Sequence, residues 1–175
     1  MDFAMTDEQE LLLESVREFC DRYFTEDVIK EMYETGDMPD EIAEAYRDAG
    51  FGLMGIPEEY GGIPCDKVTL GMMIEELYHS SGCNHILYQN SLTAFDIVEF
   101  GTPEQIQKYM DAYMETGWPL CSLSISEPGA GSDNRNMSCT AKKQDDGTYR
   151  LNGQKTWVTM GAKLPYTIVV AKDED

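Results

Sequence analysis

The sequence lacks any apolar run of about eighteen residues, so it predicts no membrane span. It also lacks a basic flank followed by an apolar core at its start, where the residues read MDFAMTDEQE. We therefore expect neither a secretory signal nor a transit peptide, and a cytoplasmic location is the expectation that follows.

Patterns typical of metal sites are missing too. The only histidines are His79 and His85, and no Cys-x-x-Cys pair occurs among the scattered cysteines, which are Cys20, Cys65, Cys83, Cys121 and Cys139. We expect reduced, mostly buried thiols and no metal site.

Basic side chains are scarce, and their distribution divides the chain. The net charge is −20, yet residues 119–175 carry seven bases and seven acids, so residues 1–118 carry six bases against 26 acids. Such an acidic surface repels nucleic acid and anionic membranes, and we expect neither as a partner. A polyanionic ligand would lie toward the neutral part, while the acidic excess also suits a solvated helical exterior.

The first two thirds of the sequence has helical periodicity. Thr6-Asp-Glu-Gln9 has the form of a capping box, and apolar residues follow at helical spacing: Leu12, Val16, Phe19 and Tyr23. Further helices are predicted from Pro39 to Gly50 and from Thr102 to Gly117. The inner face of the last one is predicted to consist of Ile106, Tyr109, Met110 and Tyr113. Residues 68–78 and 84–101 are apolar around most of their circumference, which predicts the buried centre of a bundle.

After Trp118-Pro119 the sequence changes to short runs of β-branched, small and alternating residues. Asp145-Asp-Gly147 stands between two of these runs and is a hairpin signal. We therefore predict an α+β fold, in which an all-α helical bundle over residues 1–118 precedes an incomplete antiparallel β-domain over residues 119–175.

The stretch ISEPGAGSD, residues 125–133, is the strongest candidate for a binding loop. It lacks the third glycine and following helix of a Rossmann loop and the Gly-Lys-Ser/Thr of a Walker A loop. Its glycines would let the backbone approach a ligand closely, and Ser126 and Ser132 add hydroxyl groups. The loop suits a flat, phosphate-bearing cofactor, although composition alone leaves a tight polar turn equally open.

Residues 124–136, SISEPGAGSDNRN, closely resemble the first signature of the acyl-CoA dehydrogenase family, and residues 151–159, LNGQKTWVT, resemble that family's next conserved strand. Three further segments resemble motifs of the same family and occur in the same order: residues 56–62, 90–92 and 101–105, which read IPEEYGG, NSL and GTPEQ. The resemblance therefore covers essentially the whole chain.

Two positions depart from the family pattern, because Ser124 stands where Gly, Ala or Cys is usual and Asn136 where a smaller residue is usual. The word HILYQ, residues 85–89, is most similar to the carnitine-pathway branch of the crotonobetainyl-CoA reductase type.

The resemblance implies a helical domain, a middle β-barrel domain of which residues 119–175 form part, and a C-terminal helical domain, with FAD and an acyl-CoA thioester held between them. It places FAD contacts on Leu123, Ile125, Ser126, Gly131, Ser132, Trp157 and Thr159, with Ser132 also near the substrate ester. An indole can cover an isoalloxazine ring and hydroxyls can bond its polar edge, so these residue types are chemically suitable. Core packing is the alternative for Trp157, as it is for Tyr88 and Leu92 beside the acyl pocket.

The activity implied is α,β-dehydrogenation of acyl-CoA thioesters or the reverse, in fatty acid or carnitine metabolism, with electron-transfer flavoprotein as electron partner. The family's carboxylate base belongs to its C-terminal domain, so no catalytic residue is assigned and Glu127 is interpreted as part of the loop. The chain alone is expected to be inactive and to need a homo-oligomer or a second polypeptide that completes the fold. A non-catalytic binding or assembly module and a CoA-ester carrier without flavin remain as alternatives.

Overall fold

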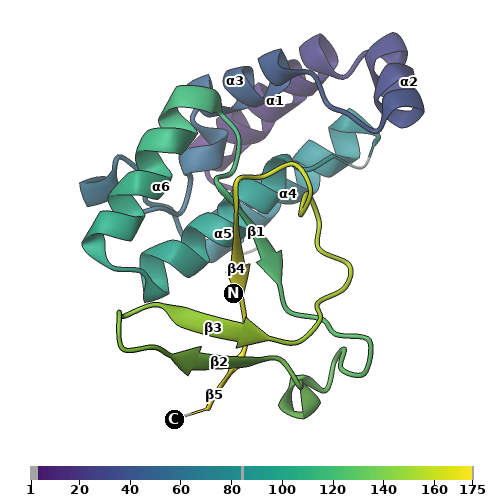
Figure 1. The fold of residues 1–175 in the computed structure, drawn as a ribbon. Helices are drawn as coiled ribbons and strands as arrows, with labels where there is room; N and C mark the ends of the chain where they lie inside the picture. The colour runs from purple at the N-terminus through teal and green to yellow at the C-terminus, as the bar shows by residue number, and fades with distance from the viewer. Residues whose placement is uncertain (1–3, 84, 175) are drawn as a thin grey trace. The chain divides into compact units, whose positions relative to one another are not determined.

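The computed structural model describes residues 4–83 and 85–174, which fall into two compact units, Met1–Trp118 and Pro119–Asp175. The described part of the first unit is helical (Figure 1), with 3-10 turns at Phe51–Leu53 and Glu58–Tyr60. Its α-helices are α1 (Asp7–Tyr23), α2 (Glu26–Thr35), α3 (Asp40–Asp48), α4 (Lys67–Ser81), α5 (Leu87–Phe100) and α6 (Pro103–Thr116).

Helix α1 begins with the predicted capping box, since Thr6 and Gln9 exchange side-chain to backbone hydrogen bonds. Its buried stripe is shifted slightly from the expected one, with Leu12 and Tyr23 half-buried and the buried positions at Leu13, Val16, Phe19 and Cys20. The stripe packs on α4. Near the start of both helices Gln9 donates to Thr69, and further along both helices Arg17 pairs with Glu76. The two helices therefore run parallel.

The core of the helical unit is built around aromatic rings. Phe19 meets Phe51 edge to face with ring centroids 5.6 Å apart, and Tyr46 lies fully buried beside both. Edge-to-face packing is favoured by the ring quadrupoles. Met73 and Leu77 of α4 are fully buried against this cluster, so the prediction that residues 68–78 lie at the centre is confirmed for the middle of that segment.

The ends of the two apolar segments behave differently from the prediction. Val68 is 68% exposed and Phe100 is 78% exposed, so the apolar character of these segments does not translate into burial around the whole helix. Helix α5 starts at Leu87, and Asn84, where the segment was expected to begin, lies outside the described residues. In the family-like segment at residues 90–92, the side chains of Asn90 and Ser91 also lie outside what the structure describes.

Helix α2 was not predicted from the sequence. It contains no fully buried residue among those described, and its apolar stripe is short, with Val28, Ile29 and Met32 half-buried against the core. Its signals are its caps: Thr25 accepts the Val28 amide at its start, and Gly36 adopts a left-handed conformation at its end.

Helices α3 and α6 confirm their predictions. Helix α3 follows Pro39, and Gly50 lies just beyond it in the left-handed region at φ 79°. Helix α6 has Pro103 at its first turn and a Thr102–Gln105 capping box, and Gly117 closes it in the left-handed region. The expected inner face is the buried one: Ile106, Tyr109, Met110 and Tyr113.

The second unit contains two small sheets instead of one antiparallel domain. Its strands are β1 (Cys121–Ser124), β2 (Thr140–Lys143), β3 (Tyr149–Asn152), β4 (Tyr166–Val169) and β5 (Lys172–Asp173). The β2–β3 hairpin is antiparallel, which confirms the turn prediction at residues 145–147. The expectation of an antiparallel domain is wrong for the other pairs, because β1 pairs with β4 and β2 with β5 in parallel. Long connections separate both parallel pairs, and local turn signals cannot report such pairing.

The expected strand at residues 151–159 ends at Asn152. Gly153 has φ 149° and Trp157 has φ 59°, and neither value is compatible with a continued β-strand. Trp157 and Thr159 therefore stand on a loop.

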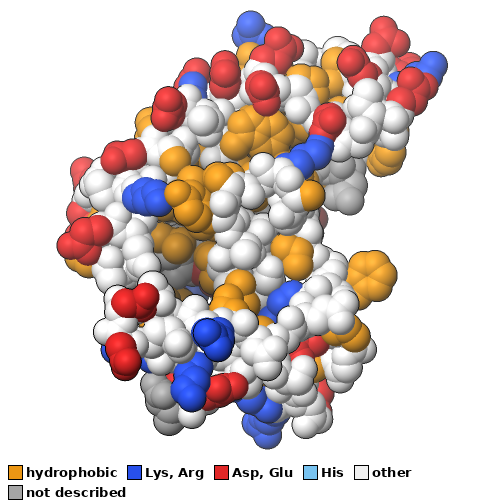
Figure 2. Space-filling view, viewed as in Figure 1, with side chains coloured by type: hydrophobic (Ala, Val, Ile, Leu, Met, Phe, Trp, Pro, Cys, Tyr) orange, Lys and Arg blue, Asp and Glu red, His pale blue; other side chains and the backbone are white. Residues whose placement is uncertain are grey.

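The described residues contain no helix long and apolar enough to cross a membrane. All five cysteines are free, and all except the half-buried Cys65 are buried, as predicted. Figure 2 shows carboxylate side chains distributed over the helical unit and both charge signs on the β unit, in keeping with the sequence counts.

Candidate functional site

The segment at residues 125–133 forms a tight turn closed on itself. Glu127 and Ala130 exchange backbone hydrogen bonds, with Glu127 N donating over 2.9 Å and Ala130 N donating over 3.2 Å. A 3-10 turn at Asn134–Asn136 follows and leads the chain toward β2. The Pro-Gly dipeptide at the tip of the turn is typical of such geometry.

The carboxylate of Glu127 is buried and accepts hydrogen bonds from several donors. Ser138 donates from its amide over 2.6 Å and from its hydroxyl over 2.7 Å, the Cys139 amide donates over 2.8 Å, and the Lys155 ammonium donates over 2.9 Å. These bonds, led by the Ser138 amide, lower the pKa of Glu127 to about 2. An acceptor so fully occupied and so weakly basic is unsuited to proton abstraction at neutral pH, which supports its interpretation as part of the loop.

Lys155 connects this turn to the segment that carries Trp157. Its ammonium also donates to the carbonyl of Ile125 over 2.8 Å, and its side chain is 10% exposed. One residue later, the Thr156 amide donates to the carbonyl of Ser126 over 2.9 Å. Residues 125–127 and 155–156 therefore lie side by side, although 28 positions separate Glu127 and Lys155 in the sequence.

The two glycines of the turn have no packing role within the described residues. A Cβ atom added at Gly129 or at Gly131 would meet no atom within 4 Å, and neither backbone lies in the left-handed region. Gly153 offers a contrast, since a Cβ there would stand 2.6 Å from Cys139 Cα. Space for a ligand is therefore available at both positions of the turn.

Trp157 is the most exposed large apolar side chain among the described residues, at 91%. It also holds a left-handed backbone, with φ 59°, which costs a non-glycine residue about 1–2 kcal/mol. An unfavourable backbone that presents a bare indole to solvent is a candidate ligand contact, and the core-packing alternative for Trp157 is excluded within the described chain.

The structure places the predicted site residues in two classes. Leu123, Ile125 and Ser126 are half-buried, with Leu123 in β1 opposite Ile168, whereas the exposed ones are Gly131, Ser132, Trp157 and Thr159. Ile125 and Ser126 are brought beside the Trp157 segment by the hydrogen bonds above. Within the described residues, no hydrogen bond joins Gly131 or Ser132 to Trp157 or Thr159.

Sequence reasoning missed the Glu127–Lys155 pair and the hydroxyl of Thr156. Thr156 Oγ1 is buried and has no hydrogen-bond partner among the described atoms. The sequence does show an acid in the motif at residues 124–136 and a base in the motif at residues 151–159. The two residues are too far apart in the sequence for a local pattern to predict that they pair.

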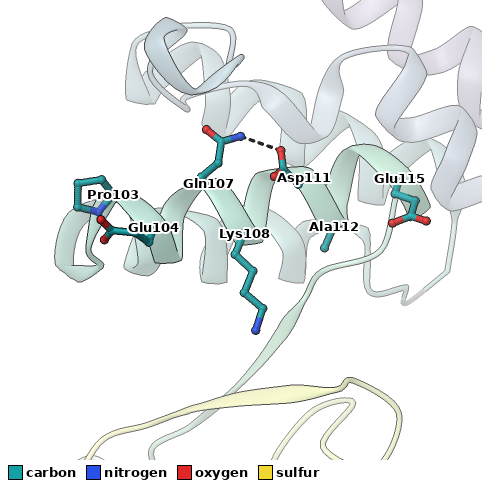
Figure 3. A pocket seen from close by; sticks show the side chains of 7 residues that line it. All are labelled: Pro103, Glu104, Gln107, Lys108, Asp111, Ala112 and Glu115. Atoms are coloured by element: carbon teal, nitrogen blue, oxygen red, sulfur yellow. Dashed lines mark hydrogen bonds between the residues drawn. The ribbon is translucent and has the colours of Figure 1, made fainter. Parts of the chain in front are cut away.

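A shallow depression on the outer side of α6 is a weaker candidate. Figure 3 shows Lys108 and Glu104 side chains extending from the helix and Gln107 donating to Asp111, a bond of 2.7 Å. All residues around this depression belong to one helix, and most are polar, so it lacks the enclosing apolar walls of a ligand pocket. No group of three or more potential metal ligands occurs among the described residues.

Comparisons with known proteins identify one family over both units of the chain. The family profile of the acyl-CoA dehydrogenase N-terminal domain matches residues 6–116, and that of the acyl-CoA dehydrogenase middle domain matches residues 122–175. The probable acyl-CoA dehydrogenase YdiO of Escherichia coli strain K12 is 39% identical over 173 residues, which cover 99% of this chain and 45% of YdiO.

Two solved structures are similar over nearly the whole chain. An FAD complex of PigA has a TM-score of 0.83 at 26% identity and covers 100% of this chain and 46% of PigA. The ChsE4–ChsE5 complex from Mycobacterium tuberculosis has a TM-score of 0.80 at 28% identity, covering 98% of this chain and 44% of the matched one. The chain thus spans less than half the length of these relatives.

Proposed function

Because the chain belongs to the acyl-CoA dehydrogenase family of FAD-dependent enzymes, we propose that residues 119–175 form one wall of a flavin site in an enzyme that interconverts acyl-CoA and enoyl-CoA thioesters. The proposed FAD contacts are Leu123, Ile125, Ser126, Gly131, Ser132, Trp157 and Thr159. The observation that carries the proposal is the exposed, left-handed Trp157 beside the Ser126 turn.

The residues present fit a flavin in shape and chemistry. An exposed indole can stack on a flat heteroaromatic ring, and the open space above Gly129 and Gly131 admits a ligand against bare backbone. Hydroxyls at Ser126 and Thr159 can donate to ring heteroatoms. When bound, the flavin supplies hydride transfer, while the protein residues orient it and exclude water.

Residues 1–175 are proposed to supply binding and orientation without a catalytic base. Glu127 is occupied by its donors, and Ser132 is proposed to lie near the substrate ester. Oxidation or reduction of an acyl-CoA is therefore proposed for the whole protein, in fatty acid or carnitine metabolism, with residues 1–118 and 119–175 as its first two domains.

The site is proposed to be completed by a second subunit, either another copy or a different polypeptide, with electron-transfer flavoprotein as redox partner. The ChsE4–ChsE5 relative is itself a complex of two differently named proteins. The free cysteines suit a reducing compartment such as the cytoplasm.

A two-dimensional amide spectrum of the ¹⁵N-labelled chain, recorded during FAD titration, tests the flavin wall. The indole N–H of Trp157 should shift with added FAD, together with the amides of Gly129 and Gly131. Trp118 is an internal control, since its indole N–H donates to Asp40 over 2.8 Å in the helical unit and should not move. No shift at Trp157 up to about 1 mM FAD in the whole protein, together with the subunit that completes the site, overturns the proposal.

The same titration separates the alternatives. A CoA-ester carrier predicts shifts with acyl-CoA and none with FAD. An assembly module predicts no response to either ligand, and instead a concentration-dependent loss of signal as the chain self-associates.

A further inference from the structure

Glu127 and Lys155 connect the two segments of the proposed flavin wall through a nearly buried ion pair. The nitrogen–oxygen distance is 2.9 Å, and the side chains of Lys155 and Glu127 are 10% and 2% exposed. The same ammonium reaches the Ile125 carbonyl over 2.8 Å. Lys155 therefore contacts the turn at two points, two residues before Trp157.

We infer that Glu127 and Lys155 are positioning residues, which hold the Trp157 segment against the Ile125–Ser126 backbone so that the flavin wall is formed before the cofactor arrives. The inference rests on the proposed function and adds to it the pair that organises the site. Preformed sites bind more tightly because less ordering is required on binding.

The left-handed backbone of Trp157 makes such support necessary. A strained conformation persists only where its surroundings determine it more than once. Within the described residues, the Thr156–Ser126 backbone bond is the remaining hydrogen bond that ties residues 155–157 to the turn. One neutral bond is exchangeable with water, whereas the charged bonds from Lys155 are shielded by burial and are stronger.

The hydrogen bonds of the pair also show which partner to change. When Lys155 is replaced, the Glu127 carboxylate, which is 2% exposed, loses its counter-charge but keeps its three hydrogen bonds from Ser138 and Cys139, and these bonds hold the turn together. Removal of Glu127 instead frees those donors and leaves a nearly buried ammonium without its counter-charge. Lys155→Met is therefore the more selective variant, because it removes the charged bonds between the segments and leaves the hydrogen bonds within the turn in place.

The experiment compares FAD affinity and thermal unfolding for the unchanged chain, Lys155→Met, Lys155→Arg and Lys142→Met. Lys142 is exposed in the β2–β3 hairpin and serves as a matched control for the loss of a lysine. We expect Lys155→Met to weaken FAD binding by about tenfold or more. Lys155→Arg should restore most of the affinity, because a guanidinium can donate to both the Glu127 carboxylate and the Ile125 carbonyl. Lys142→Met should leave the affinity unchanged.

A merely structural role would give a different result. It predicts a lowered unfolding temperature for Lys155→Met with unchanged FAD affinity, and that outcome overturns the inference. Affinity that arginine fails to restore overturns it as well. If Lys155→Met does not fold, Lys155→Gln replaces it, since it keeps a donor for the Ile125 carbonyl, and the same affinity criterion applies.

The two proposals fail separately. Unchanged whole protein, with the subunit that completes the site, that shows no FAD response at Trp157 refutes the flavin wall itself. An unchanged chain that binds FAD, alongside a Lys155→Met variant that binds it equally well, refutes only the positioning role.

Discussion

The imidazole of His85 lies flat on the ring of Tyr78, with ring centroids 4.5 Å apart and planes 9° apart. Phe24 stacks on the same imidazole at 5.0 Å. Neither ring nitrogen of His85 has a hydrogen-bond partner among the described atoms, and the residue is 4% exposed. Burial of this kind favours the neutral imidazole over the charged one.

This burial predicts acid sensitivity. Burial lowers the pKa of His85 to about 4, below its ordinary value of 6.5 in an unfolded chain. The unfolded state binds the extra proton first, so the stabilising contribution is complete above pH 6.5 and falls as the pH drops from 6.5 to 4. The expected loss is on the order of 3 kcal/mol, measured as the urea midpoint at pH 7.5 and pH 4.5.

His85→Phe is the control for the acid effect, because it keeps a flat ring between Tyr78 and Phe24 without a titrating group. Its urea midpoint should fall less over the same pH range. An equal fall in both proteins would assign the acid sensitivity to carboxylates instead.

Substitutions in the turn should separate folding from binding. Gly129→Ala and Gly131→Ala meet no neighbouring atom, so their free energies of unfolding should stay within about 0.5 kcal/mol of the original. Each methyl group would nevertheless stand where a ligand approaches, and FAD binding should weaken. Chemical denaturation and FAD titration of the same samples measure the two effects.

Gly117→Ala provides the opposite case for comparison. Gly117 has φ 72°, and its added Cβ would lie 2.5 Å from the carbonyl oxygen of Ala43, so unfolding should become easier by more than about 1 kcal/mol. If Gly129→Ala destabilised the chain as strongly as Gly117→Ala, the turn glycines would have a packing role that the described structure does not show.

Replacing Trp157 by asparagine should remove FAD binding without loss of stability. Asparagine tolerates the left-handed region and Trp157 buries almost no surface, so the free energy of unfolding should remain unchanged or rise by up to about 1 kcal/mol. Trp118→Phe makes Trp157 the single indole, and FAD should then quench its fluorescence. A clear loss of stability in Trp157→Asn would show that the indole packs.

The caps of α6 predict a local stability effect. Thr102 accepts the Gln105 amide, and Thr102→Ala should cost about 1 kcal/mol because that amide loses its partner at the helix start. Ser15→Ala, at an exposed position in the middle of α1, removes a bond to the Leu11 carbonyl and is the control. Urea unfolding of both variants measures the difference, and equal effects would contradict the capping role.

Local signals predicted much of the helical unit because their causes are local. Capping boxes at Thr6 and Thr102 and left-handed glycines at Gly50 and Gly117 act within one turn of chain, so the residues alone reveal them. Helix α2 escaped prediction because it spans only Glu26–Thr35 and its apolar face is limited to the half-buried Val28, Ile29 and Met32, which is too short a pattern for periodicity to detect.

By itself, the sequence determined that helices give way to strands after Pro119, that a hairpin turn lies at residues 145–147, and that the glycines of residues 125–133 belong to a loop. Only the tertiary structure decided that β1 and β4 pair in parallel, that Trp157 points into solvent from a left-handed backbone, and that Lys155 joins Glu127 across 28 positions. The physical reason is range: turns, caps and periodicity are encoded among neighbours, whereas parallel pairing and buried ion pairs depend on which distant segments the fold brings together.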